Sequence, residues 1–96
     1  MRPQAENDVL QAAHWYDRQR VGLGDEFILE VLATLESLEI NPLLNCRRHP
    51  TKNIRWRYPD RFPYRVIYEV LESERVVVVA AVIHAARHDR VWQRRF

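Results

Sequence analysis

The sequence has a single cysteine, two glycines and one lysine among its 96 residues. With Cys46 as the only thiol, no disulfide can form within the chain, which is typical of proteins that work in a reducing compartment. No apolar run approaches the roughly 20 residues that a membrane-spanning helix needs, and Met1-Arg2-Pro3 does not open a signal peptide. These absences predict a soluble cytoplasmic protein with no membrane contact.

The apolar content of the chain sets its domain count. Of the 96 residues, 47% are apolar and ten are aromatic, which is enough for one hydrophobic core but not for two independent ones. We therefore expect residues 1–96 to form one domain, and any functional site has to be built on that domain.

The charges are divided between the two halves of the chain. Residues 1–44 carry three arginines against eight carboxylates, whereas residues 45–96 carry twelve basic side chains against five carboxylates. Nearly all of the basic side chains are arginines, whose planar guanidinium suits phosphate and carboxylate groups. The basic half predicts an anionic partner, either nucleic acid or an acidic protein surface. The alternative is that the arginines only solubilise the outer face of a sheet.

Two helices are predicted in the first half. Apolar residues recur at helical spacing over Pro3–Arg20, with Pro3 in the first turn, and they recur again after Asp25, which is placed to cap the second helix. Gly22-Leu23-Gly24 breaks the periodicity between the two segments, and Asn41-Pro42 ends the second one. We expect an antiparallel helical hairpin whose shared apolar side lies on a sheet.

Three strands are predicted in the second half, after a basic loop over residues 43–53. Ile54–Tyr58 and Tyr64–Leu71 alternate as strands do, and Val76–Ile83 is an unbroken apolar run, typical of a strand buried on both faces or at a sheet's centre. Glu72–Arg75 has no apolar residue and fits a hairpin turn. The order predicts an α+β domain, a helical hairpin packed on a small antiparallel sheet. The last residues, 88–96, are expected to form a turn of helix or an extended tail held by Trp92.

Arginines are interleaved with these strands. Arg55 and Arg57 alternate with Ile54, Trp56 and Tyr58, so we expect them on the outer face of the sheet, where a nucleic-acid backbone would meet them.

Several segments occur in an order and spacing that resemble a known family. They are Ala12-Ala13-His14-Trp15-Tyr16, Gly22-Leu23-Gly24 with Phe27, Ile40-Asn41-Pro42, Arg61-Phe62-Pro63-Tyr64-Arg65-Val66-Ile67-Tyr68, Ala81-Val82-Ile83-His84-Ala85-Ala86-Arg87 and Trp92-Gln93-Arg94-Arg95. From about Pro3 to Arg95 they resemble the RelE/ParE superfamily, the toxins of type II toxin–antitoxin (plasmid stabilisation) systems of bacteria and archaea. The resemblance implies the matching fold and a cognate antitoxin protein as partner.

The chain departs from the family at its start. Family members usually have a β-strand before the first helix, and this chain starts almost at the helix. The resemblance therefore implies a sheet that lacks one strand and has an exposed edge. Another chain could fill that edge in a homodimer or by strand exchange.

The superfamily contains two functional classes. RelE-like members resemble endoribonucleases that cut mRNA on the ribosome, which needs an acid/base and cations around the phosphorane. That class would assign catalysis to His84, Arg65 and Arg87. ParE-like members resemble inhibitors of DNA gyrase, which act by binding and have no active site. Trp92 falls near a tyrosine that transfers a proton in several nucleases, and an indole, being only a donor, cannot replace it.

Structural roles are the alternative for each of these residues: a satisfied histidine at His84, an ion pair of the fold at Arg65, and an anchor for the C-terminal tail at Trp92. A third function is a small basic domain that binds nucleic acid without toxin activity. Nucleic acid or an acidic, partly disordered segment of the antitoxin is expected to bind one set of residues: Arg48, Lys52, Arg55, Arg57, Arg61, Trp92, Arg94 and Arg95. No cofactor is expected, and His14, His49, His88 and Cys46 lack the spacing of a metal site.

Overall fold

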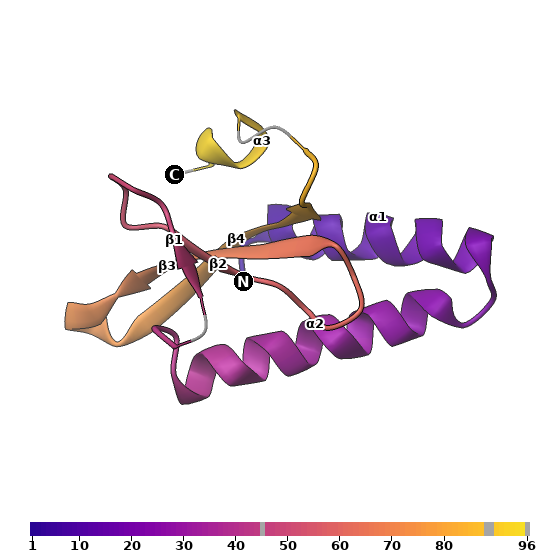
Figure 1. Cartoon of the computed structure of the whole chain (residues 1–96), viewed down its shortest axis with the longest axis horizontal. Coiled ribbons are helices and arrows are strands. Elements are labelled where there is room, and N and C mark those ends of the chain that lie inside the picture. Colours follow the sequence, from indigo (N-terminus) through magenta and orange to yellow (C-terminus); the bar gives the residue numbers. More distant parts are fainter. Residues whose placement is uncertain (45, 88–89, 96) are drawn as a thin grey trace.

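The computed structural model describes residues 1–44, 46–87 and 90–95. Two antiparallel helices, α1 (Pro3–Gln19) and α2 (Leu23–Ile40), pack on a four-stranded antiparallel sheet (Figure 1). Its strands lie in the order β1 (Arg47–Arg48), β2 (Arg55–Arg57), β3 (Tyr64–Leu71) and β4 (Val76–His84). The predicted α+β architecture is confirmed. Neither long helix is apolar enough along its length to cross a membrane, over the part of the chain that the structure describes.

The turn between the helices differs from the prediction. Gly22, with φ of +91°, directly precedes α2, so the helix begins at Leu23 and Asp25 lies inside its first turn rather than at the cap. The capping oxygen comes from α1 instead, because Asp17 Oδ1 accepts the N–H of Gly24 at 2.7 Å. This bond satisfies one of the free N–H groups at the start of α2 and fixes the two helices close together.

The sheet contains one strand more than the sequence predicts. β1 lies inside the expected 43–53 loop and pairs its two residues with Trp56 and Arg55 of β2. β3 has its predicted bounds, and β4 extends one residue further than predicted, to His84. A 3-10 turn over Glu72–Glu74 joins them.

β4 contains a bulge that changes the direction of its side chains. Tyr68 pairs with Val79, but the preceding residue of β3, Ile67, pairs with Ala81, so that Ala80 is an extra residue in the ladder. An extra residue reverses the alternation of faces beyond it. Val79 and Val82 therefore both pack in the core on the helical side of the sheet, although they are three residues apart.

A second, smaller core lies on the opposite face. The short helix α3 (Arg90–Gln93) places Trp92, which is fully buried, against Ile67, Ile83 and the smaller apolar side chains beside them. Of the two forms predicted for residues 88–96, a turn of helix or an extended tail held by Trp92, the structure has the turn of helix at Arg90–Gln93. Residues 88, 89 and 96 lie outside the described part. Both faces of β4 are thus covered, although β4 forms the edge of the sheet.

The edge of β4 has hydrogen-bond partners within the chain. The N–H of Arg2 donates to Val79 O at 2.9 Å, Arg95 Nη1 donates to Ala80 O at 3.0 Å, and the N–H of Val82 donates to Asp8 Oδ2 at 3.0 Å. Within the described residues no strand precedes α1. A second chain that pairs with β4 between residues 79 and 82 would have to replace these three bonds, and such pairing stays a prediction.

Candidate functional site

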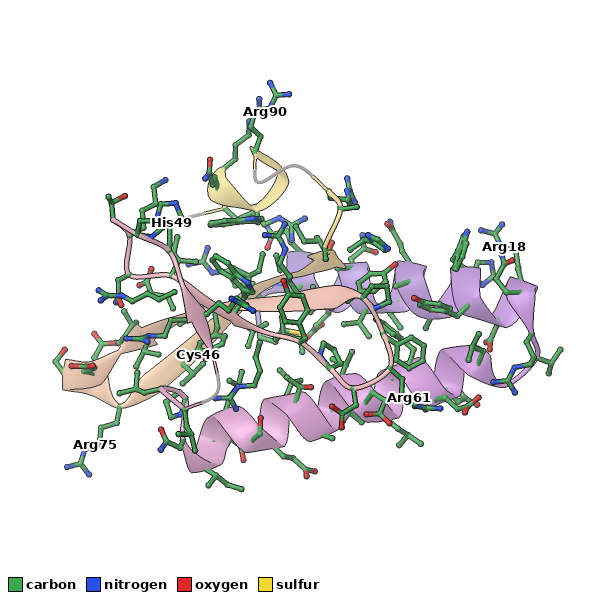
Figure 2. The ribbon with its side chains drawn as sticks, in the orientation of Figure 1. Arg18, Cys46, His49, Arg61, Arg75 and Arg90 are labelled. Carbon is green, nitrogen blue, oxygen red and sulfur yellow. The ribbon has the colours of Figure 1, made fainter. Side chains whose placement is uncertain are left out.

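Exposed cations gather on the side of the sheet that carries α3. The β1–β2 loop lies beside α3, since the ring centroids of His49 and Trp92 are 6.2 Å apart, and Figure 2 shows His49 and Arg90 on the same side of the sheet. These two segments carry four exposed basic side chains on this side, which we call the basic surface: Arg47, Lys52, Arg90 and Arg94. Lys52 and Arg94 belong to the predicted binding set. Arg48, which is also exposed, pairs with Arg55 and therefore lies on the helical side of the sheet. The arrangement suits an extended anionic partner.

Arg55 and Arg57 do not point to the outer face, and that expectation is wrong. They pair in register with Tyr68 and Val66, whose side chains lie in the helical-side core. Arg57 Nη1 donates to Ser37 Oγ at 2.6 Å and its Nη2 to the carbonyl of Asn41 at 2.9 Å. Arg57 therefore satisfies polar groups at the C-terminal end of α2, where carbonyls lack helical partners.

Arg55 lies beside a buried tyrosine. Its Nη1 contacts Cys46 Sγ at 3.6 Å, and the hydroxyl of Tyr68 donates to the carbonyl of Pro42 at 2.6 Å. Burial raises the pKa of Tyr68, the Cys46 thiol adds to this effect, and the charges of Arg57 and Arg55 oppose it. Tyr68 therefore remains a neutral donor at physiological pH, and Arg55 and Arg57 stabilise the fold around it.

Two further arginines of the predicted binding set form ion pairs with the helices. Arg61 lies 3.4 Å from Glu26 and 3.5 Å from Glu30 on α2, and it remains largely exposed. Arg95 Nη1 lies 2.7 Å from Asp8 Oδ2 on α1, in a pair that is mostly buried. Arg95 therefore joins α1, β4 and the C-terminal segment. Trp92, also in the predicted binding set, is buried in the second core.

The structure separates Arg65 from the other two nuclease candidates, His84 and Arg87, which line one hollow. Arg65 pairs in register with Ile83, whereas His84 pairs with Tyr64, so Arg65 and His84 lie on opposite faces of the sheet. Arg65 is only 6% exposed, its guanidinium lies 5.7 Å from the ring of Trp56, and its Nη2 donates to Arg87 O at 3.1 Å. Arg65 thus holds the turn after β4 in place.

The imidazole of His84 is fixed by its own turn. The N–H of Ala86 donates to His84 Nδ1 at 3.0 Å, which selects the neutral tautomer with its proton on Nε2. In this tautomer Nε2 donates a hydrogen bond and cannot accept a proton. His84 is therefore poorly arranged to deprotonate a ribose hydroxyl through its outward nitrogen.

Sequence reasoning missed the surroundings of His84. The ring of Tyr64 lies 5.4 Å from the imidazole, and Trp15 of α1 is 48% exposed beside the same hollow. The sequence offered one signal: Trp15 flanks the apolar stripe of its helix, where a tryptophan is not needed for the core. Within the described residues, no three His, Cys, Asp or Glu side chains are grouped so that they could hold a metal ion.

Comparison with known proteins gives one match. A family described as "ParE toxin of type II toxin-antitoxin system, parDE" matches residues 1–89. No curated protein and no solved structure matches the chain.

Proposed function

Because the chain belongs to the ParE toxin family of type II toxin–antitoxin systems, we propose that it inhibits DNA gyrase by binding it, without an active site of its own. The family also implies a cognate antitoxin as its partner. Gyrase works in the cytoplasm, so the proposal places the toxin there.

The opposite faces of Arg65 and His84 are the observation that carries this proposal. A ribonuclease would need a cation and an acid/base around one phosphate. Here Arg65 is buried against Trp56. Arg87 lines the same hollow as His84, but the Nδ1 of His84 is occupied by the N–H of Ala86, so no base accompanies this cation. These contacts favour a binding protein over the alternative, a RelE-like endoribonuclease.

Two parallel assays of the purified protein test the target. We expect it to inhibit supercoiling by DNA gyrase and to leave ribosome-bound mRNA uncut. Cleavage of the mRNA that is lost in both His84→Ala and Arg87→Ala would overturn the proposal and restore the ribonuclease. Binding to RNA or DNA with neither gyrase inhibition nor cleavage would favour a small basic nucleic-acid-binding domain instead.

The basic surface is the place where we expect the antitoxin to bind. Arg47 lies on β1, Arg94 directly follows α3, and both side chains are exposed. An acidic, partly disordered segment would be attracted to them over several charges at once. The expected contact differs from the residues predicted from sequence, because Arg55, Arg57 and Arg95 are already bonded within the fold.

Reversing two charges of the basic surface tests this contact. The double variant Arg47→Glu, Arg94→Glu is expected to weaken antitoxin binding about tenfold or more, because two attractions become repulsions. The matched control Arg18→Glu, Arg75→Glu makes the same change in net charge at exposed positions elsewhere, as Figure 2 shows. Calorimetric titration of the antitoxin measures both. An equal loss in the two double variants would mean that only net charge matters, and no loss in the first would place the antitoxin on another face.

A further inference from the structure

A cavity of about 200 Å³ lies between α1 and the end of β4, away from the basic surface. From α1 it is lined by Asp8, Gln11 and Trp15, and from the sheet and the following turn by Tyr64, His84 and Arg87. The lining combines an exposed aromatic ring with cationic and neutral hydrogen-bond donors. The residues proposed to bind the antitoxin are not among those that line it.

Three donors face this cavity. His84 presents its Nε2–H, because its Nδ1 accepts from Ala86. Arg87 has an exposed side chain on a fixed backbone: its N–H donates to His84 O at 3.0 Å and its carbonyl accepts from Arg65 at 3.1 Å. The Arg87 charge also acts on the Tyr64 hydroxyl, since it lowers the pKa of Tyr64 against the larger, raising effect of burial.

The one carboxylate in the lining is already neutralised. Asp8 Oδ2 lies 2.7 Å from Arg95 Nη1 and accepts the N–H of Val82 at 3.0 Å, and Asp8 Oδ1 lies 3.3 Å from Arg95 Nη2. A two-point pair with an arginine leaves this carboxylate little charge to repel an anion. The cavity as a whole is therefore electropositive.

We propose that this cavity binds a nucleotide unit, with its phosphate on Arg87 and His84 and its base stacked on Trp15. A phosphate offers several acceptor oxygens in a tetrahedral arrangement, which suits a guanidinium fork, an imidazole N–H and a tyrosine hydroxyl better than a planar carboxylate does. A tryptophan ring stacks on any base because every base has a π face. The site is distinct from a catalytic centre: nothing in it abstracts a proton.

The test uses the whole protein and three probes: adenosine 5′-monophosphate, inorganic phosphate and adenosine. The indole N–H signals of the three tryptophans are followed by NMR, with the Trp15 signal assigned from Trp15→Leu. We expect the monophosphate to shift the Trp15 signal and to bind at least about tenfold more tightly than either fragment, because the ring and the phosphate are held together. The signal of Trp92, buried on the other face, should stay in place.

Arg87→Gln is expected to weaken binding of the monophosphate about tenfold, while Arg18→Gln, the same change near the end of α1, leaves it unchanged. Trp15→Leu should weaken it independently of the charge. The proposal would be overturned if Arg87→Gln bound the monophosphate as tightly as the unsubstituted protein does, or if only another tryptophan signal shifted. If a short glutamate-rich peptide bound the cavity as tightly as the monophosphate, the cavity would be a carboxylate site for a protein partner. This result would also overturn the proposal. None of these measurements involves gyrase or an antitoxin, so the outcome is independent of the proposed function.

Discussion

Replacing Trp92 by alanine is expected to lower the free energy of unfolding by about 3–5 kcal/mol, the range for removing a large buried aromatic side chain. Trp92 is fully buried and is the only large side chain that α3 contributes to the core around Ile67 and Ile83, within the described residues. Its loss would expose the outer face of the sheet and the buried Arg65. Urea unfolding followed by circular dichroism measures the change.

The matched control is Trp15→Ala, which removes the same side chain from a site that is 48% exposed. We expect this variant to lose less than about 1 kcal/mol, as surface substitutions do. If both variants lost the same free energy of unfolding, the contacts of Trp92 in the second core would not stabilise the protein as described.

Gly24→Ala is expected to cost about 2–3 kcal/mol, because the added methyl group overpacks the contact between the helices. A Cβ at this position would overlap the carbonyl oxygen of Ala13 and would lie 2.7 Å from Asp17 Cγ. The hydrogen bond from Gly24 to Asp17 would be lost as α1 and α2 move apart. Thermal and urea unfolding of the variant test this.

Gly22→Ala separates backbone strain from close packing. Nothing lies within 4 Å of a Cβ at Gly22, but its φ is +91°, where an alanine is strained. We expect a cost of about 1–2 kcal/mol from the left-handed backbone alone. A larger loss for Gly22→Ala than for Gly24→Ala would contradict the view that the helices are in contact at Gly24.

The periodic parts of the fold could be predicted from the sequence. Tyr64–Leu71 alternates over eight residues, and its observed bounds are those predicted. The two residues of β1 could not be found, because a pair of arginines has no periodicity and is a strand only through its pairing with β2. The sequence predicts Asp25 as the cap of α2. In the structure Gly22 occupies the cap position, and Asp17 of α1 supplies the capping oxygen.

The faces of the arginines were harder to predict, because the rule that polar residues face outward holds only for a sheet with one open face. Here α3 covers part of the outer face, so Arg65 is buried there. On the opposite face, Arg57 points toward the helices and reaches polar groups at the end of α2. In both cases the arginine donates hydrogen bonds to acceptors on residues that are distant from it in the sequence.

The bulge at Ala80 explains why the candidate catalytic residues could not be placed. Regular pairing outward from the turn would put His84 on the same face as Arg65, as a shared active site requires. One extra residue in the ladder moves His84 to the other face, opposite Tyr64. An unbroken apolar run such as Val76–Ile83 contains no residue that marks where a bulge falls, so the separation of the two side chains is visible only in the structure.

The cover on the edge of β4 has a consequence for the order of folding. Asp8 and Arg95 are 87 positions apart in the chain, and their contact closes one of the longest loops in the molecule. The entropy lost in closing such a loop is recovered only once the intervening hairpins are in place, so this ion pair forms late. Until then the backbone groups at the edge of β4 are unpaired and can hydrogen-bond to another chain. The risk of misassembly is therefore concentrated in the interval before the two ends of the sequence meet.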